Sequence, residues 1–319
     1  MKNNLEKLNL QAKYEGLIFG AAIGDALGMP TEYISKEELD QFYGGRITNF
    51  ERPHQNHPCS HLNAGQYTDD TQQLILLTES LIQKKGFDIF DFGQKIGEWA
   101  HRCQTVSDYN RFAGGTSLSA GIKIHCGENP LTAGGSRATC GSAMRVSPLG
   151  LFYRNNISQL KEIATRASLV THNNLAAIDS AIFISHLVAY LSNDVTIKEA
   201  AQKSRELLSS DLKKNIDYVL ANTHKNPREV AAKIGASESA YETVPMALHC
   251  FLYSPEDYEQ SVTEAANLVP GDTDSIACIA GALSGTYNGV EAIPKKWRQE
   301  IEDSLLLQKL SKDLFEASV

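Results

Sequence analysis

The 319-residue chain lacks most features that mark secreted, membrane-spanning or nucleic-acid-binding proteins. Its six cysteines form no CxxC pair, which argues against a disulfide framework or a structural zinc site and favours free thiols in a reducing compartment. The net charge of −8 argues against nucleic acid or an anionic membrane as the main partner, because both bind basic surfaces. The first apolar run is interrupted by Asp25 and is too short to span a membrane and too mixed in charge for a signal peptide. We therefore expect a cytoplasmic protein.

Strand signals are scarce as well, since no apolar–polar alternation continues beyond about five residues. Residues 160–191 read as two helices that are broken near His172 and Asn173. Helix-start signals recur along the chain, at Ser35 with Glu38, Thr196 with Glu199, Asn226 with Pro227 (ending at Gly235), and Ser254 with Pro255. These patterns predict an all-α fold.

No repeat, low-complexity tract or Pro/Ser-rich linker divides the chain. We expect a polar extension over residues 1–13 and one domain over residues 14–319. Two regions, about 43–67 and 105–145, are rich in glycine and polar residues and are expected to be loops. Loops of this length inside a compact domain are more often functional than idle.

Two acidic clusters stand directly before helical patterns. Residues 68–71 read Thr-Asp-Asp-Thr, and residues 272–275 read Asp-Thr-Asp-Ser. The helix expected after the second cluster consists almost wholly of small residues such as Ala277, Gly281 and Gly285. Such residues let another helix backbone approach closely, which suits a helix at the centre of a bundle.

Both clusters have a simple alternative explanation as helix N-caps, because Asp, Ser and Thr accept bonds from the first N–H groups of a helix. Capping, however, requires one such residue, and a second carboxylate adds repulsion with little further benefit. Four carboxylates with alcohol oxygens, and no His or Cys among them, are ligands that hard cations prefer, so Mg²⁺ or Mn²⁺ is expected before Zn²⁺. If the two helix starts meet, they form a two-metal site.

Five segments occur in an order that resembles the ADP-ribosylglycohydrolase family, which includes dinitrogenase reductase-activating glycohydrolases and ADP-ribosyl-arginine hydrolases. They are "GAAIGDALGMPTE", "YTDDTQQ", "CGSAMRVSPLGL", "VTHNNLAAIDSA" and "PGDTDSIACIAGALSG", and the resemblance extends from about residue 14 to residue 290. It implies a single compact orthogonal helical bundle whose binuclear Mg²⁺ or Mn²⁺ site lies at converging helix N-termini and loops. The metal ligands implied by the resemblance are Thr68, Asp69, Asp70, Asp272, Asp274 and Ser275.

The resemblance also implies catalytic roles. Asp69 and Asp274 would act through the metal centre, and Glu32 matches a glutamate that orients or deprotonates water. Without the resemblance, Glu32 would be read as a surface carboxylate after a helix end. Asp25 lies in an otherwise apolar helix, where an unpaired charge is costly. We expect it to hydrogen-bond a metal-bound water on the substrate side rather than to bind a metal directly.

Diphosphate recognition needs backbone N–H donors. By resemblance, Gly114, Gly115 and Thr116 face ribose and phosphate, and a phosphate-binding turn comprises Gly141, Ser142, Ala143 and Met144. The usual turn begins Gly-Asn-Gly, whereas this chain has Thr139-Cys140-Gly141. Arg145 is open to two interpretations, as a phosphate partner or as a member of a structural ion pair.

Three further assignments concern single side chains. By resemblance, His172 lies close to the substrate, although a lone histidine after an apolar stretch is commonly a core residue. Adenine is expected to stack on an aromatic ring, with Tyr109 and Phe112 among the candidates. The histidines of "HQNHPCSH" (residues 54–61) fit no common zinc spacing, and the stretch is expected to shape the entrance of the site.

The main hypothesis is a metal-dependent hydrolase that removes ADP-ribose from a modified protein side chain, with arginine as the first choice. Three alternatives remain open at the level of sequence. One is a catalytically silent ADP-ribose-binding protein, and the second is an immunity protein that neutralises an ADP-ribosylating toxin. The third is a generic two-metal phosphoesterase, which would release AMP. The sequence does not distinguish among acceptor residues, target proteins, Mg²⁺ and Mn²⁺, or oligomeric states.

Overall fold

The computed structural model describes the backbone of residues 2–318 and the side chains of residues 7–318. All regular elements in this part of the chain are helical, and the described residues form only two isolated β-bridges, Gly135–His172 and Thr139–Ser239. The all-α prediction is therefore confirmed. In chain order the elements are α1 (Lys2–Gly28), η1 (Met29–Thr31), α2 (Lys36–Tyr43), α3 (Asp69–Lys84), α4 (Ile89–Thr105), α5 (Gly115–His125), η2 (Cys140–Ser142), α6 (Ser147–Phe152), α7 (Ile157–Leu169), α8 (Leu175–Ser192), α9 (Ile197–Glu206), α10 (Leu212–Ala221), α11 (Pro227–Ile234), α12 (Ala240–Tyr253), α13 (Tyr258–Ala266), α14 (Thr273–Asn288), η3 (Val290–Ala292), α15 (Lys295–Glu300) and α16 (Ser304–Ser318).

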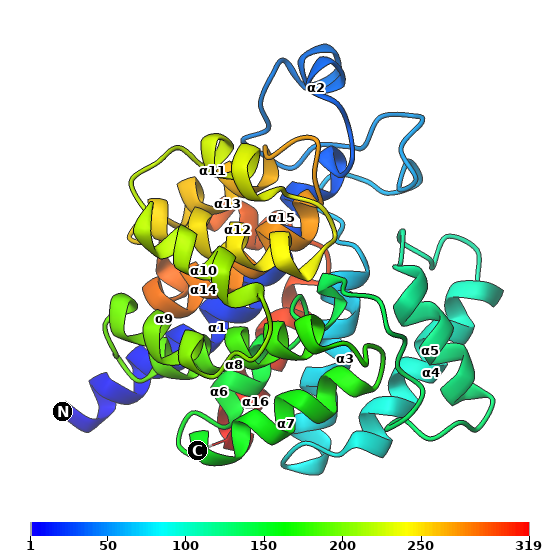
Figure 1. Cartoon of the computed structure of the whole chain (residues 1–319), viewed down its shortest axis with the longest axis vertical. Helices are drawn as coiled ribbons and strands as arrows, with labels where there is room; N and C mark the ends of the chain where they lie inside the picture. Colours follow the sequence, from blue (N-terminus) through cyan, green and yellow to red (C-terminus); the bar gives the residue numbers. More distant parts are fainter. Residues whose placement is uncertain (1, 319) are drawn as a thin grey trace.

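Helices α1 and α14 form the centre of the bundle, and Figure 1 shows α1 crossing the middle of the molecule. Their backbones are so close that a Cβ atom built at Gly24 would lie 2.0 Å from the carbonyl oxygen of Ala277. A Cβ atom at Gly281 would likewise lie 2.0 Å from the oxygen of Gly20. The small residues of α14 therefore serve the close helix contact that the sequence predicts.

The two central helices run antiparallel, because Gly16 faces Gly285 at one end and Gly28 faces Thr273 at the other. The C-terminal end of α1 is thereby placed against the N-terminal end of α14. The hydroxyl of Thr273 strengthens this junction, since it donates to the carbonyl oxygen of Gly28 at 3.0 Å. Glu32, which follows the end of α1, consequently lies beside the Asp-Thr-Asp-Ser motif.

The start of α3 is held against the same end of α1 by Asp25. The carboxylate of Asp25 accepts bonds from the N–H and hydroxyl groups of Thr68, at 2.9 Å each. It also accepts bonds from the N–H and hydroxyl groups of Thr71, at 3.0 and 2.6 Å. One buried side chain of α1 therefore places the Thr-Asp-Asp-Thr motif next to Glu32.

Most of the predicted helix boundaries agree with the structure. The capping box at Ser35 forms, α11 begins after Asn226, and the break between α7 and α8 falls at residues 170–174. The predicted helix start at Ser254 and Pro255 is wrong, because Asp257 caps α13 by accepting the N–H of Gln260 at 2.9 Å. The expected loop over residues 105–145 contains the helix α5.

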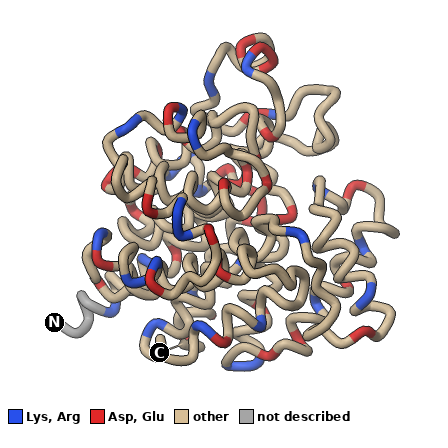
Figure 2. Tube along the Cα trace, in the orientation of Figure 1, with Lys and Arg blue, Asp and Glu red and all other residues tan. Residues whose placement is uncertain are grey.

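Helix α8 is long and apolar enough to cross a membrane by length and composition, but 83% of it is buried inside the protein. It is therefore a core helix of the bundle. Acidic and basic residues alternate over the described trace without a continuous band of one sign (Figure 2). The expected boundary after residue 13 falls within α1, which is continuous from Lys2 to Gly28.

Candidate active site

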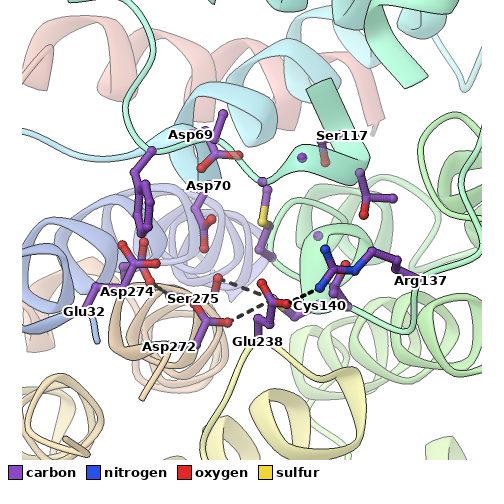
Figure 3. Close-up of a pocket in the computed structure, with 18 of the residues that line it drawn as sticks. Glu32, Asp69, Asp70, Ser117, Arg137, Cys140, Glu238, Asp272, Asp274 and Ser275 are labelled. Carbon is purple, nitrogen blue, oxygen red and sulfur yellow. Dashed lines mark hydrogen bonds and ion pairs between the residues drawn. The ribbon is translucent and has the colours of Figure 1, made fainter. Parts of the chain in front are cut away.

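The two acidic motifs meet in one pocket, although about 200 residues separate them in the sequence. Figure 3 shows Asp69 and Asp70 facing Asp272 and Asp274 across this pocket. The first pair begins α3 and the second pair begins α14, so the N-terminal ends of both helices point at the same space. The structure thus brings together the two helix starts that the sequence singles out.

The Thr-Asp-Asp-Thr motif combines capping with exposure of carboxylate oxygens to the pocket. Thr68 caps α3 by accepting the N–H of Asp70, and its side chain lies behind the pocket wall. Asp69 accepts a bond from the amide of Gln73, one helical turn later, at 2.7 Å. The Oδ2 atom of Asp70 is buried and has no hydrogen-bond partner.

The Asp-Thr-Asp-Ser motif is oriented by donors from other elements. Oδ2 of Asp272 accepts bonds from the thiol of Cys140 at 3.1 Å and from the hydroxyl of Thr243 at 3.3 Å. Asp274 accepts the N–H of Ser275 at 2.8 Å. The hydroxyl of Ser275 lies 3.5 Å from the Cys140 sulfur at the pocket wall.

Glu32 is a member of the same acidic cluster and not the surface carboxylate of the alternative interpretation. Its side chain is 7% exposed, and its Oε2 atom has no hydrogen-bond partner. Oxygen atoms of Glu32, Asp272 and Asp274 lie within 4.8 Å of one another. Among the described residues, these three form the only group of His, Cys, Asp and Glu side chains close enough to hold a metal ion.

The carboxylates of the pocket are poorly suited to lie together without a cation. Burial first, and then the charge of the neighbouring Asp25, raise the pKa of Asp69 to about 7. Burial, and then the charge of Asp274, raise the pKa values of Glu32 and Asp70 well above their ordinary range. Together with the two unpartnered carboxylate oxygens, this arrangement fits hard, oxygen-binding cations, which restore the charged form of each ligand.

Asp25 differs from its expected role. It does not line the pocket, and its two oxygens are occupied by the four bonds from Thr68 and Thr71. The expectation of a contact with a metal-bound water is therefore replaced by a structural role. Asp25 braces the motif whose carboxylates face the pocket.

The glycine-rich loop at residues 114–116 lies on the pocket wall, as the sequence predicts. Gly114 precedes α5 without a side-chain cap, so the first N–H groups of this helix are available to a ligand. A Cβ atom at Gly114 or Gly115 would meet no atom within 4 Å, and the space above them is open. A helix N-terminus with free N–H groups is suited to bind phosphate.

The second predicted turn, residues 141–144, contributes only in part. Gly141 and Met144 line the pocket, whereas Ser142 and Ala143 are buried behind it. The hydroxyl of Ser142 is 2.8 Å from that of Ser168, which explains why it points into the core. The expectation that Ser142 and Ala143 contact substrate is therefore not met through their side chains.

His172 lines the pocket and belongs to a buried hydrogen-bond network. Thr171 accepts a bond from Arg145 at 2.6 Å, so its hydroxyl hydrogen is directed to Nδ1 of His172, 2.7 Å away. Nε2 of His172 then carries the proton and donates to Thr139 at 2.8 Å. Burial lowers the pKa of His172 to about 3, which is consistent with a neutral ring.

Arg145 proves to be neither a phosphate partner nor half of an ion pair. It is fully buried and donates to Gln73, Thr171 and the carbonyl oxygen of Ala167. Because Gln73 also holds Asp69, the network connects this carboxylate to His172. The contact of Gln73 with Asp69 and Arg145 could not be predicted from the sequence, because Gln73 occupies an ordinary position within a helix.

The pocket residues Arg137, Glu238 and Tyr33 were not identified from the sequence, whereas Phe112 was one of the two aromatic candidates. Arg137 and Glu238 form an ion pair of 2.8 Å on the side of the pocket opposite Glu32 (Figure 3). Tyr33 and Phe112 line the rim, whereas Tyr109 lies under the guanidinium of Arg102 and outside the pocket. These residues come from loops, where no periodic pattern indicates which side chains converge.

The histidine-rich stretch supports the pocket. His57 is buried, its Nδ1 accepts the N–H of Cys59 at 3.0 Å, and its Nε2 lies 3.3 Å from the carbonyl oxygen of Glu32. This geometry makes Nε2 the protonated nitrogen, which donates to Glu32. The stretch therefore reaches the site through a backbone contact to Glu32, and none of residues 54–61 lines the pocket itself.

Comparison with known proteins agrees with the fold. A solved structure described as an ADP-ribosylglycohydrolase-related protein complex superposes with a TM-score of 0.79 and 26% identity. The superposition covers 98% of this chain and 99% of the other. A sequence profile of the ADP-ribosylglycohydrolase family matches residues 6–319, and the chain belongs to this family.

Two relatives illustrate the range of similarity. An uncharacterized protein of Archaeoglobus fulgidus is 32% identical over 96% of this chain and 97% of its own length. The ADP-ribosylarginine hydrolase Tri1 of Pseudomonas putida is 26% identical over 95% of this chain and 77% of its own length. Family membership makes the chain an ADP-ribosylglycohydrolase, an enzyme that hydrolyses a glycosidic bond.

Proposed function

We propose that this enzyme removes ADP-ribose from modified arginine side chains of proteins, and that it does so with two Mg²⁺ or Mn²⁺ ions. The observation that carries the proposal is the convergence of the two acidic motifs and Glu32 on one pocket bordered by the N-terminus of α5. The similarity to Tri1, which is named as an ADP-ribosylarginine hydrolase, supports arginine as the acceptor.

The substrate lies in this pocket with its ribose at the carboxylates and its diphosphate at α5. The N–H groups at Gly115 and Thr116 bind phosphate oxygens, which the positive end of the helix favours. Gly141 lies beside the start of α5, because a Cβ atom built on it would lie 3.3 Å from Oγ of Ser117 and would collide with the His172 ring at 2.6 Å. The nucleotide part is thereby fixed before the bond at the ribose breaks.

The metal ions would be held by Asp69, Asp70, Asp272, Asp274, Ser275 and Thr68. They would supply positive charge near the ribose hydroxyls and the attacking water, and this charge would lower the pKa of that water. The Thr68 hydroxyl donates its hydrogen to Asp25, so its oxygen lone pairs are the part of the group that could bind a cation.

Bond breakage at the anomeric carbon builds positive charge on the ribose ring. The buried carboxylates on both sides of the pocket are negative, so they attract that positive charge and stabilise the transition state. Glu32 orients the attacking water and accepts its proton, and this proton passes to the departing guanidine nitrogen. The new bond joins the water oxygen to the anomeric carbon, and free ADP-ribose and unmodified arginine result.

The products distinguish this function from its alternatives. We expect chromatography to detect free ADP-ribose and no AMP after incubation with an arginine-modified protein in Mg²⁺. Release of AMP would identify a phosphoesterase instead. Release only from serine-linked ADP-ribose would keep the enzyme class and overturn the arginine assignment, and binding of ADP-ribose without any release would indicate a catalytically silent protein.

An immunity role, in which a toxin is a partner, predicts a stable complex with an ADP-ribosylating protein. No surface feature of the described residues favours that role, and co-purification of such a protein with an Asp274→Asn variant would be its test.

A further inference from the structure

The pocket has two chemically different ends. Figure 3 places Glu32 at one side and Arg137 at the opposite side, with the carboxylates between them. Beyond Arg137 the pocket adjoins a second hollow that shares Gly115, Thr116 and Arg137 and also contains Lys123. Arg137, which pairs with Glu238, and Lys123 therefore lie toward the second hollow, whereas Tyr33 and Phe112 lie beside Glu32, with Phe112 two residues before the N-cap of α5.

Two aromatic rings form the rim next to Glu32. Tyr33 is 44% exposed and Phe112 is 42% exposed, and both side chains line the pocket. Their ring centroids are 6.4 Å apart at an interplanar angle of 84°. Two neighbouring exposed rings on a pocket wall offer apolar ring faces to a ligand.

Both rings are presented by strained backbone. Tyr33 has φ of 55° and Phe112 has φ of 64°, values that bulky residues rarely adopt. The N–H of Tyr33 donates to the carbonyl oxygen of Gly271 at 2.9 Å, which ties it to the second acidic motif. The turn at Phe112 is fixed by the bond from the N–H of Ala113 to Asn110, at 3.0 Å. Strain that the surrounding structure maintains at a pocket points to a functional position.

We propose that Tyr33 and Phe112 form the acceptor subsite, which binds the guanidinium group of the leaving arginine through the faces of their rings. This inference rests on the proposed function. A cation is attracted to an aromatic face within about 6 Å, and a planar guanidinium also stacks on it. The adjacent acidic cluster adds a negative field that favours a cationic acceptor over a neutral one.

The alternative occupant of these rings is adenine, and the polarity of the pocket argues against it. In ADP-ribose the bond to the acceptor and the bond to the phosphate leave the ribose from opposite ends of the sugar. If the diphosphate lies at α5, the adenosine extends toward Arg137 and Lys123. The acceptor then leaves toward Glu32, where Tyr33 and Phe112 are located.

The test measures binding to the full-length protein in Mg²⁺ by isothermal titration. The probes are ADP-ribose, followed by agmatine as a guanidinium probe on the ADP-ribose-loaded protein. The variants are Phe112→Leu and Tyr33→Leu, which keep apolar volume and remove a ring face. Phe90→Leu is the matched control, because Phe90 is 59% exposed and lies outside this pocket.

We expect agmatine binding to weaken by about three- to thirty-fold in Phe112→Leu, the range of a cation–π contact, and to be unchanged in Phe90→Leu. ADP-ribose affinity should change by less than about twofold in all three variants, because the rings lie on the acceptor side. The KM for an arginine-modified protein should rise in Phe112→Leu in parallel with the loss of agmatine binding.

Three results would overturn the subsite: no agmatine binding by the wild-type protein, equal agmatine affinity in Phe112→Leu, or a larger loss of ADP-ribose affinity than of agmatine affinity. The last would assign the rings to adenine. Melting curves of both leucine variants separate a lost contact from a misfolded pocket, and Tyr33→Leu provides the test if Phe112→Leu fails to fold. If the wild-type protein released no ADP-ribose from arginine, the proposed function would fail, whereas the agmatine titration would still report on the subsite.

Discussion

At the scale of single residues, the buried acidic cluster lowers the stability of the metal-free protein and serves the activity of the metal-bound protein. Glu32, Asp69, Asp70, Asp272 and Asp274 are each at most 7% exposed, and they face one pocket. Burying like charges together disfavours the folded state unless a cation compensates. We therefore expect the cluster to be a liability in the metal-free protein and the basis of activity in the metal-bound protein.

The first prediction concerns Asp274. Asp274→Asn should raise the melting temperature of the metal-free protein, by about 2–4 °C for each kcal/mol of repulsion removed. It should also lower activity by about 10²-fold or more and reduce the temperature shift caused by Mg²⁺. Thermal melts in EDTA and in Mg²⁺ measure both effects. Asp211→Asn is the control, since the Asp211 side chain is 74% exposed. A destabilised metal-free Asp274→Asn would contradict the account of the cluster.

The second prediction separates Glu32 from the metal ligands. Glu32→Gln keeps the size of the side chain and removes its ability to accept a proton, and we expect kcat to fall by about 10²- to 10⁴-fold. The Mg²⁺-induced rise in melting temperature should remain. A parallel loss of that rise would show that Glu32 binds metal, which its closeness to Asp272 and Asp274 also allows.

The residues of the site differ in how far the sequence predicts them. The carboxylates of both acidic motifs could be identified because two charged residues at a helix start exceed what capping needs. Gln73, Arg137 and Cys140 could not, since each acts on a partner that is distant in the chain or carries no sequence pattern of its own. For Asp25, the cost of burying an unpaired charge predicted that the carboxylate is hydrogen-bonded, but it could not identify the partners. These are Thr68 and Thr71 in the structure, where a metal-bound water was expected.

At the scale of elements, the contact between α1 and α14 determines the geometry of the site, because it aligns Glu32 with the second acidic motif. Gly24 is the third prediction. Its added Cβ would lie 2.0 Å from the oxygen of Ala277, so Gly24→Ala should force the helices apart and destabilise the protein by about 1–3 kcal/mol. Chemical denaturation measures this change.

The control for Gly24 is Gly114→Ala, judged on stability alone. Gly114 has φ of −60°, and an added Cβ would meet no atom within 4 Å. Its free energy of unfolding should change little. Equal effects at the two positions would mean that the close helix contact is not what limits substitution at Gly24.

Helix boundaries were predictable where a cap and a breaker frame the pattern, as at Asn226 and Gly235. They were not predictable where two capping residues compete. Ser254 and Asp257 both precede the same apolar face, and Asp257 is the residue that accepts the first N–H bonds of α13. Helix α5 was missed because its glycines and serines have low intrinsic helix propensity, and its packing against α4 compensates, as the contact of Gly121 with Ala100 illustrates.

At the scale of the whole molecule, we propose that residues 14–319 form one domain. The residues before position 14 extend the same helix, and buried Lys13 donates to the carbonyl oxygen of Leu191 at 3.1 Å. Helices α4 and α5 lie side by side at one side of the molecule (Figure 1). Calorimetry of the metal-free protein should show one cooperative transition. A separate early transition would instead indicate that a part such as the α4–α5 pair unfolds independently.

The all-α class followed from the scarcity of strand patterns, but the arrangement of the helices did not follow from helix periodicity. The meeting of residues 68–71 with residues 272–275 depends on the antiparallel register of α1 and α14 and on the brace from Asp25. A sequence shows that two motifs share a chemistry, whereas their distance is a property of the packed bundle.

The most direct test of the central claim is the release of free ADP-ribose from an arginine-ADP-ribosylated protein in Mg²⁺, in Mn²⁺ and in EDTA. We predict release with either metal, none with EDTA, and loss of release in Asp274→Asn. Undiminished release in EDTA, or full activity of Asp274→Asn in Mg²⁺, would contradict the assignment of the acidic pocket as a metal-dependent active site.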